Sequence, residues 1–415
     1  MNYRPRIADS ELARMRRALG AVLIEGPKAC GKTETASQVA RTIVRFDKDE
    51  AARAQVALDP DSLFAGGTPI LFDEWQLEPT IWDRVRREVD DRRSKGDFIL
   101  TGSARPRDDA NRHSGAGRFG TLRMRPMSLF ESGHSTGEVS FAALLAGERQ
   151  TGLGTHLSFD ELLRRIVIGG WPEITDWPED EARDWLQGYI AQIVEVDMPA
   201  MGHRRNPRNL RRLLSSLARN VGQAVKQTEL ARDVAGDAGT ISAETIAGYL
   251  ETLDRLGLTD DSAAWRPHMR SKTPLRAAEV RYFVDPSLGT AAAGIGSAEL
   301  RADPRATGFH FEALVIRDLR VLAQSHRGVV DSWRDANGNE VDAVISINDN
   351  KWAAFEVKLN PRDVDDAATA LLRFSANVDK DRHSEPAALG VITSTGVAGR
   401  RHDGVHVIPI GCLGP

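Results

Sequence analysis

Residues 21–40 read AVLIEGPKACGKTETASQVA, and this stretch decides the fold of the N-terminal part of the chain. The apolar run at residues 21–25 predicts a buried strand, and residues 32–40 predict a helix. The loop between them matches the pattern G-x-x-x-x-G-K-[ST], in which glycines let successive backbone N–H groups turn inward toward phosphate oxygens. The sequence therefore predicts a phosphate-binding loop made of Gly26, Pro27, Lys28, Ala29, Cys30, Gly31, Lys32 and Thr33.

Further apolar runs follow this loop at intervals that suit an α/β fold. Residues 42–46, 69–72 and 98–100 each predict a strand, and helical stretches separate them. Strands that alternate with helices form a parallel sheet with helices on both faces. We therefore expect residues 1–135 to form a P-loop nucleotide-binding domain.

Two acidic residues follow the strand at residues 69–72, where the chain leaves the sheet. We expect Lys32 to reach the β- and γ-phosphates of ATP, while the Thr33 hydroxyl and the Asp73 carboxylate hold Mg²⁺. Glu74 could polarise the attacking water, or it could be a solvated acid at a strand end. Together these residues predict an ATP–Mg²⁺ site that hydrolyses ATP.

Other residues near the loop have two interpretations each. Thr101 and Ser103, at the end of the strand at 98–100, could orient water or sense the γ-phosphate, or they could be ordinary turn formers. Arg118, in the segment GAGRFG, could be an arginine finger that acts in its own subunit or in a neighbouring one. It could equally be an exposed loop arginine. Cys30 could make binding sensitive to oxidation, or it could be a tolerated small residue.

The overall composition is that of a soluble globular protein with more than one domain. The chain has 415 residues, of which 41% are hydrophobic and 27% are charged. The net charge of −4 means that any surface for nucleic acid must be local. The two cysteines fit a reducing cytoplasm, and we find neither a signal peptide nor an apolar run long enough to cross a membrane.

Residues 136–300 are mostly helical and carry a local excess of positive charge. No acidic residue occurs in residues 198–228. Three helices and a hairpin-like segment predict a winged helix, and the cations predict a DNA or RNA partner. Against this, Glu244, Glu251 and Asp254 lie on the helix that would enter the major groove, so the basic face could instead hold an acidic domain. The cations are Arg204, Arg205, Arg208, Arg211, Arg212, Arg219 and Lys226, followed by Arg266, Arg270, Lys272 and Arg276.

Residues 301–415 predict a second α/β core with a cluster of acidic side chains. Glu312 lies on its opening helix, and Asp342 lies in the strand-like segment EVDAVIS. In the next strand, alternation puts Glu356 and Lys358 on the same side. The pattern resembles the D…E-x-K signature of restriction-endonuclease-like nucleases. The three carboxylates could hold Mg²⁺, and Lys358 could activate water or stabilise the phosphate. Such domains can also keep these residues for binding alone.

Five motifs occur in one order along the chain: GPKACGKT, PILFDEWQ, FILTGSA, GRFGTLRMRPMSLFE and GGWPE. They resemble the motifs of a large group of prokaryotic AAA+-type ATP-binding proteins. In that group an ATPase domain precedes a C-terminal region of unknown function that is related to restriction-endonuclease folds. The resemblance covers nearly the whole chain and implies the same roles for Lys32, Thr33, Asp73 and Glu74. Trp75 departs from the pattern, because an aliphatic residue is expected in D-E-x-Q.

The expected fold class is therefore α/β in three parts. An AAA+-like P-loop NTPase sheet comes first, a helical winged-helix-like region follows, and a restriction-endonuclease-like domain ends the chain. One function is an ATPase that couples its nucleotide state to a nuclease-like or nucleic-acid-binding module. The alternative is a nucleotide-dependent switch or scaffold that binds a protein partner and has a catalytically inactive C-terminal domain. A ring-shaped oligomer would allow Arg118 to act between subunits.

Overall fold

The computed structural model divides the chain into two compact units, and each contains its own sheet. The first unit is Met1–Pro126 with Arg255–Gly257, and the second is Met127–Asp254 with Leu258–Pro415. The expected division at residue 300 lies inside the second unit. The residues described by the structure are 3–102, 115–152, 156–200, 206–236, 239–266, 279–335, 337–347, 351–379 and 383–415.

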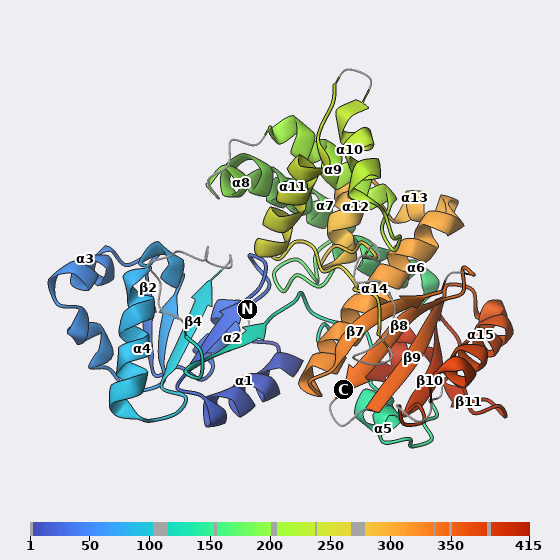
Figure 1. The fold of residues 1–415 in the computed structure, drawn as a ribbon, viewed down its shortest axis with the longest axis horizontal. Helices are drawn as coiled ribbons and strands as arrows, with labels where there is room; N and C mark the ends of the chain where they lie inside the picture. Colours follow the sequence, from blue (N-terminus) through green and yellow to red (C-terminus); the bar gives the residue numbers. More distant parts are fainter. Residues whose placement is uncertain are drawn as a thin grey trace. The chain divides into compact units, whose positions relative to one another are not determined.

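The first unit is built on a five-stranded sheet in the order β2-β3-β4-β1-β5 (Figure 1). All its strands are parallel, which confirms the prediction of a parallel sheet. The strands are β1 (Ala21–Glu25), β2 (Thr42–Arg45), β3 (Ile70–Asp73), β4 (Phe98–Gly102) and β5 (Phe119–Arg123). The helices are α1 (Ile7–Ala18), α2 (Lys32–Ser37), α3 (Glu50–Leu58) and α4 (Thr80–Arg92).

Alternate side chains of these strands face opposite sides of the sheet. On one side, Leu23, Phe72 and Leu100 join an apolar cluster with residues of α3 and α4. On the other side, α1 and α2 pack against the sheet. Burial on both faces explains why β1, β3 and β4 read as continuous apolar runs in the sequence.

The second unit begins with a helical region. Its short first strand, β6 (Val139–Ser140), pairs in parallel with β13 (Leu413–Gly414), so the chain end returns to the start of this unit. The helices before the second sheet are α5 (Phe141–Leu145), α6 (Phe159–Ile168), α7 (Glu179–Gln192), α8 (Met198–Ala200), α9 (Pro207–Arg219), α10 (Gln227–Ala235), α11 (Ala243–Arg255), α12 (Pro286–Ala293) and α13 (Ser297–Ala302).

Helices α9, α10 and α11 precede a short antiparallel pairing. Backbone bridges join Thr259 to Phe283 and Ser262 to Val280. The leucines along one side of α9 are buried, namely Leu210, Leu213, Leu214 and Leu217. Between residues 207 and 284, the described residues thus form three helices followed by a paired segment. This is the element order of a winged helix, and the winged-helix assignment stays a prediction.

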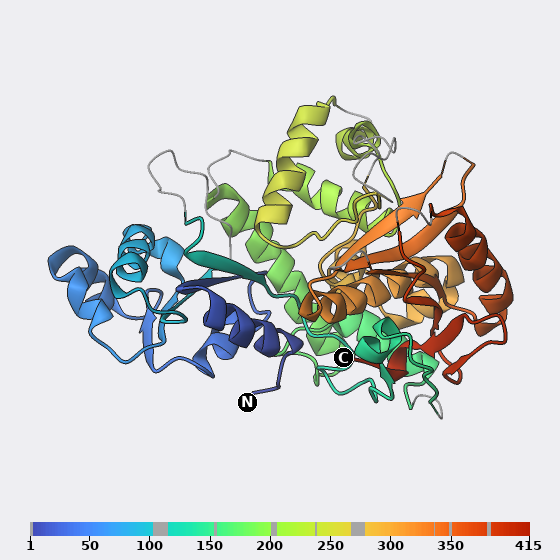
Figure 2. The same cartoon turned by 60° about the horizontal axis from the view of Figure 1, so that its bottom comes forward.

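A six-stranded sheet in the order β11-β12-β10-β9-β8-β7 completes the second unit. Strands β7 to β9 are antiparallel, whereas β9, β10 and β12 are parallel. Helix α14 (Pro304–Ser325) covers one face and α15 (Val364–Asn377) covers the other (Figures 1 and 2). The strands are β7 (Val329–Arg334), β8 (Glu340–Ile347), β9 (Lys351–Lys358), β10 (Ala388–Thr393), β11 (Gly399–Arg400) and β12 (His406–Pro409). Among the described residues, no helix combines the length and the apolar character needed to cross a membrane.

Candidate functional site

The predicted phosphate-binding loop is a tight turn between the end of β1 and the start of α2. A Cβ atom on Gly26 would lie 2.3 Å from the carbonyl oxygen of Met124, so only glycine fits there. Gly31 has a φ angle of 100° where α2 begins, a conformation that side chains rarely adopt. The loop therefore has the curled backbone and the helix N-terminus that phosphate binding requires.

Lys32 is buried and reaches back over the start of its own loop. Its Nζ donates hydrogen bonds to the carbonyl oxygens of Gly26 at 2.9 Å and Pro27 at 2.8 Å. Pro27 is buried, whereas Lys28 and Ala29 are exposed at the tip of the loop. The lysine ammonium group is thus held inside the turn, where it can exchange these carbonyl partners for phosphate oxygens.

Asp73 brings two hydroxyl groups together at the end of β3. Its Oδ1 accepts hydrogen bonds from the Thr33 hydroxyl at 2.7 Å and from the Thr101 hydroxyl at 2.5 Å. Thr101 lies opposite Asp73 in the register of β3 and β4, and both side chains are buried. Hydroxyl and carboxylate oxygens are ligands that Mg²⁺ prefers, so Thr33 and Asp73 fit the predicted role.

Glu74 is placed at the edge of the sheet by an unusual turn. Its φ angle of 55° lies in the left-handed region, which is rare for a residue with a side chain. The amide Nε2 of Gln76 donates a hydrogen bond to Glu74 Oε2. Glu74 directly follows Asp73 in the chain, and the turn directs the residue after Glu74 into the core.

That following residue is Trp75, the departure from the expected motif. It is buried, and its ring centroid lies 5.2 Å from that of Trp82 on α4. A Cβ atom on Gly102 would lie 2.7 Å from Gln76 Oε1 and 3.2 Å from Trp75 Nε1. Trp75 therefore has a packing role under the acidic pair, and the glycine at the end of β4 makes room for it.

Arg6 supports the loop from the N-terminal segment, and the sequence carried no signal for this role. Its guanidinium donates hydrogen bonds to the carbonyl oxygens of Cys30 at 2.8 Å and Arg125 at 2.7 Å. The nearby Tyr3 hydroxyl lies 3.1 Å from the Thr35 hydroxyl on α2. The loop and the helix after it are thus held by residues that precede them by one helix and one strand.

Arg118 lies at the opposite end of the sheet from the loop. Its carbonyl oxygen accepts a hydrogen bond from the N–H of Ala21, the first residue of β1, whereas the loop follows the last residue. Five strand residues, about 16 Å, separate the two ends. The Arg118 guanidinium instead forms an ion pair of 2.8 Å with Asp90 on α4. This position does not support a role in the nucleotide site of its own subunit, and a role between subunits stays a prediction.

The remaining predicted residues of this site are Cys30 and Ser103. Cys30 is fully buried, with its Sγ atom 4.0 Å from the carbonyl oxygen of Met124. A buried thiol packed in this way favours the interpretation as a small structural residue over that of a reactive one. Ser103 lies outside the described residues.

The predicted acidic cluster of the C-terminal part lies where β8 and β9 pair. Ala343 pairs with Phe355, so the adjacent residues Asp342 and Glu356 are neighbours across the two strands. Lys358 Nζ lies 2.7 Å from Glu356 Oε2. The Asp342 side chain also forms a hydrogen bond with Glu356 and accepts one of 2.7 Å from the backbone N–H of Val357.

Burial and mutual repulsion change the protonation of this cluster. Burial raises the pKa of Glu356 to about 8, and the nearby charge of Asp342 adds to the effect. Burial likewise raises the pKa of Asp342, and that of Glu312 well above its ordinary value. Burial opposes the charged form of Lys358, but the carboxylates of Asp342 and Glu356 outweigh it and raise the lysine pKa. The cluster thus holds more carboxylates than its lysine can neutralise.

Each carboxylate of the cluster has a partner within the protein. The Tyr282 hydroxyl donates a hydrogen bond to Glu312 Oε1, while Asp342 and Glu356 have the contacts given above. Across the part of the chain that the structure describes, no three Asp, Glu, His or Cys side chains are placed to hold a metal ion. The metal-binding role of Glu312, Asp342 and Glu356 therefore stays a prediction.

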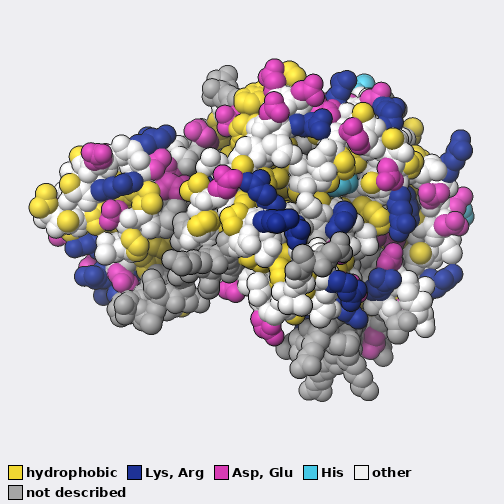
Figure 3. Space-filling view, turned by 90° about the horizontal axis from the view of Figure 1, so that it is seen from above, with side chains coloured by type: hydrophobic (Ala, Val, Ile, Leu, Met, Phe, Trp, Pro, Cys, Tyr) yellow, Lys and Arg dark blue, Asp and Glu magenta, His cyan; other side chains and the backbone are white. Residues whose placement is uncertain are grey.

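The basic residues of α9 are largely used within the second unit. Arg211 pairs with Glu195, and Arg219 lies 3.2 Å from Asp233. Arg212 donates to carbonyl oxygens near the end of α10 at 3.1 and 3.2 Å. On the face drawn in Figure 3, Lys and Arg side chains lie interspersed with Asp and Glu. The cations at residues 204, 205, 270, 272 and 276 lie outside the described residues.

The motif GGWPE forms part of a buried structural centre rather than a ligand site. Gly170 N–H donates to Asp285 Oδ2 at 3.0 Å, and Trp171 Nε1 donates to Ser287 at 2.9 Å. Arg317 on α14 pairs with Asp285 at 2.8 Å and with Asp318 at 2.7 Å. This buried network ties the helical region to α14, so residues on both sides of residue 300 belong to one compact unit.

Comparison with known protein families matches three successive segments of the chain. Residues 19–132 match a family described as "AAA domain", and residues 159–299 match one described as "Domain of unknown function (DUF8612)". Residues 307–413 match a family described as "Domain of unknown function (DUF4143)". The first segment contains the loop, Asp73 and Glu74, so the match supports an ATP-binding P-loop ATPase domain in the first unit.

The chain was also compared with individual curated proteins and with solved structures. No curated protein matches the chain. Among solved structures, the chain is similar to the Walker-type ATPase PABY2304 of Pyrococcus abyssi, with 12% sequence identity and a TM-score of 0.40. The matched region covers 70% of this chain and 96% of the Pyrococcus chain.

Proposed function

We propose that this protein is a Mg²⁺-dependent ATPase whose nucleotide state controls a C-terminal module that binds or acts on nucleic acid. The observation that carries the ATPase part is the hydrogen bond between Thr33 and Asp73. This bond joins the start of α2 to the end of β3. Its donor, Thr33, is the residue directly after Lys32. The phosphate-binding loop, the hydroxyl and the carboxylate thereby form one site.

Each residue of this site has a separate task in the proposed reaction. The backbone N–H groups of the loop and the Lys32 ammonium bind phosphate oxygens. Thr33 and Asp73 would hold Mg²⁺, which neutralises charge on the β- and γ-phosphates when bound. Glu74 orients the attacking water and accepts its proton, and Gln76 fixes the position of the Glu74 carboxylate.

ATP turnover by the purified full-length protein tests the ATPase part. The Lys32→Ala variant should bind ATP weakly and lose turnover, whereas Lys48→Ala should behave as the wild type. Lys48 is an exposed lysine of the same unit, so it controls for the loss of one positive charge. Equal turnover by wild type and Lys32→Ala would remove the loop from the mechanism.

For the C-terminal part, we propose nucleic acid as the ligand of the cluster formed by Glu312, Asp342, Glu356 and Lys358. The support is the order of its elements, in which a helix is followed by antiparallel strands, a second helix and a parallel strand. Asp342 and Glu356 lie side by side in this frame with Lys358 at 2.7 Å. A restriction-endonuclease-like domain presents such residues in this way.

The alternative function is a nucleotide-dependent switch or scaffold with a catalytically inactive C-terminal domain. The observation that favours it is the pairing within the cluster, where Tyr282 holds Glu312 and Lys358 holds Glu356. A protein partner would then take the place of nucleic acid as the ligand of this domain.

Binding and cleavage assays separate these two functions. Wild type, Lys358→Ala and the exposed control Lys351→Ala are incubated with plasmid and single-stranded DNA or RNA, with Mg²⁺ or Mn²⁺. The nucleic-acid function predicts that only Lys358→Ala loses binding or nicking. The scaffold function predicts that the three proteins neither bind nor cleave any of these substrates.

A further inference from the structure

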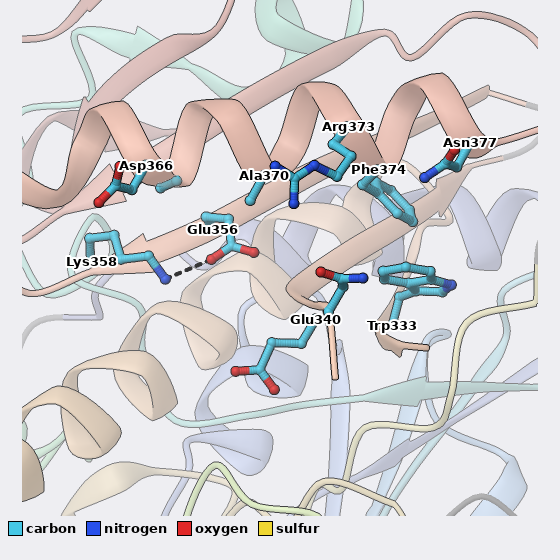
Figure 4. Close-up of a pocket in the computed structure, with 11 residues that line it drawn as sticks. Trp333, Glu340, Glu356, Lys358, Asp366, Ala370, Arg373, Phe374 and Asn377 are labelled. Atoms are coloured by element: carbon cyan, nitrogen blue, oxygen red, sulfur yellow. Dashed lines mark hydrogen bonds and ion pairs between the residues drawn. The ribbon is translucent and has the colours of Figure 1, made fainter. Parts of the chain in front are cut away.

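A cavity of about 290 Å³ lies beside Glu356 and Lys358, between α15 and the strands β7 to β9 (Figure 4). One wall is the face of α15, and the other walls come from the strands. The predicted cluster accounts for only two of its lining residues, so most of this cavity has no role in the function proposed above. Its size and lining indicate a site for a small flat group next to the cluster.

One end of the cavity is aromatic. Trp333 of β7 and Phe374 of α15 line it, with ring centroids 4.7 Å apart and planes inclined at 53°. Phe374 is buried in the core of the domain, whereas Trp333 is only half-buried. Part of the indole ring therefore faces the cavity, on a firm support formed by Phe374.

Polar groups form much of the remaining lining, and they include the Glu340 carboxylate of β8. Figure 4 shows the amide of Asn377 near the aromatic end, and Lys358 and Asp366 at the other end. Arg373 extends from α15 between these ends. It is exposed and forms no hydrogen bond or ion pair with any residue that the structure describes. An uncommitted guanidinium thus lies between an aromatic surface and the Glu356–Lys358 pair.

We propose that this cavity receives one unpaired base of a nucleic-acid strand, with the base on Trp333 and the adjoining phosphate at Arg373. The proposal rests on the nucleic-acid function proposed for the cluster and names the form of its substrate. Aromatic rings bind the flat faces of unstacked bases, and side-chain amides bind their edges. Arg373 supplies the positive charge for the phosphate, because Lys358 is already paired with Glu356.

This geometry selects a single strand over a duplex. A base inside a duplex is stacked on both faces and paired along one edge, so it must leave the stack before its face can lie on Trp333. An unpaired base enters without that cost. The strand would then place its backbone along the side of the cavity where Glu356 and Lys358 lie.

Fluorescence anisotropy with labelled DNA of one fixed length tests the proposal on the full-length protein. Three probes are used: a single strand, the same strand with abasic sites in place of its bases, and the matching duplex. Stacking of a base on an aromatic side chain is worth roughly a 5- to 150-fold change in affinity. We expect the single strand to bind more tightly than the abasic strand by this factor, and more tightly than the duplex.

Two variants locate the effect in the cavity. Trp333→Leu keeps an apolar side chain against Phe374 but removes the stacking surface, and should abolish the preference for the strand that carries bases. Arg373→Gln should weaken binding of both single strands equally. Arg362→Gln, an exposed arginine of the same domain that does not line the cavity, should bind as the wild type. Equal thermal unfolding midpoints show that the variants are folded.

The possible outcomes separate this inference from the function on which it rests. If Lys358→Ala loses binding but abasic and natural strands bind wild type equally, the base site is wrong and the nucleic-acid function stands. If the wild type prefers the duplex, the base site is also wrong. If the wild type binds none of these DNA probes and no RNA strand of the same length, both the nucleic-acid function and the base site are wrong.

Discussion

Thr33 on α2 donates a hydrogen bond of 2.7 Å to Asp73 at the end of β3. The same Asp73 oxygen accepts the hydroxyl of Thr101 from the neighbouring strand. Three elements that are far apart in sequence therefore meet at one carboxylate. This carboxylate is buried, so its orientation is fixed before a nucleotide arrives.

Asp73→Asn tests whether this carboxylate holds Mg²⁺. The amide keeps the size and can still accept a hydrogen bond, but it lacks the negative charge that binds the cation. We expect the apparent Mg²⁺ affinity in ATP turnover to fall about tenfold or more, since about 1.4 kcal/mol corresponds to a factor of ten. A Mg²⁺ titration of the turnover rate measures this, with exposed Asp47→Asn as the control. An unchanged titration curve would contradict the assignment.

Glu74→Gln tests the proposed proton acceptor. The variant should bind ATP as the wild type but turn it over about 10²- to 10⁴-fold more slowly, the range expected for loss of a general base. Single-turnover measurements with separate binding assays check both parts, and Glu78→Gln is a nearby control. Gln76→Ala should lower kcat without raising KM, because Gln76 acts only through Glu74. Normal kcat in both variants would exclude Glu74 from the mechanism.

Arg118→Ala tests the arginine-finger hypothesis. Because Arg118 lies at the far end of the sheet, ATP turnover should not change at concentrations where the chain is monomeric by sedimentation. The ion pair with Asp90 is exposed, so thermal unfolding should not change measurably either. A turnover that falls only under conditions where oligomers form would reveal a role between subunits.

Glu356 predicts a pH dependence of stability. Its pKa is about 8 in the folded protein, above the value of about 4.3 expected for an unfolded chain. The folded state therefore binds the proton more tightly, and this stabilisation is lost as the pH rises from about 5 to about 8. Relative to Glu356→Gln, the wild-type free energy of unfolding should fall across this window, on the order of a few kcal/mol.

Urea unfolding at several pH values measures this difference between wild type and Glu356→Gln. The exposed Glu148→Gln is the matched control, and its difference from wild type should not change with pH in the same way. A constant difference for Glu356→Gln would mean that the Glu356 carboxyl titrates alike in the folded and unfolded states.

Arg317→Met tests the buried network between the helical region and α14. The substitution keeps much of the side-chain volume but leaves Asp285 and Asp318 without their cation. Removal of one partner from a buried ion pair costs about 3–5 kcal/mol. Denaturant unfolding should show this loss, whereas Arg305→Met on an exposed part of α14 should show little. A similar effect of both variants would contradict the importance of the network.

The sequence predicted the strands that are buried along nearly their whole length. Strands β1, β3 and β4 are buried on both faces, so each appeared as an apolar run, and the parallel sheet that they form is confirmed. Strand β5 was missed because its residues FGTLR alternate between buried and exposed and follow a glycine-rich segment. The sequence therefore gave no sign that Arg118 lies directly before a strand.

Contacts between residues far apart in the sequence could not be predicted from local sequence patterns. Arg6 braces the loop through backbone carbonyls, and carbonyls carry no sequence signature. Arg317 and Asp285 lie on different helices, and only the fold brings these charges together. The acidic cluster could be recognised because two of its members share one strand. Its tyrosine partner, Tyr282, could not, because it comes from the other side of the expected boundary.

The position of Lys32 also has a consequence for ligand discrimination. Its ammonium group already has two carbonyl partners in the loop, so binding a phosphate exchanges hydrogen bonds instead of adding them. A nucleotide that offers few phosphate oxygens leaves the lysine where it is. The loop thus acts as a threshold, and only a ligand with enough negative charge in reach of Lys32 displaces the loop's own carbonyls.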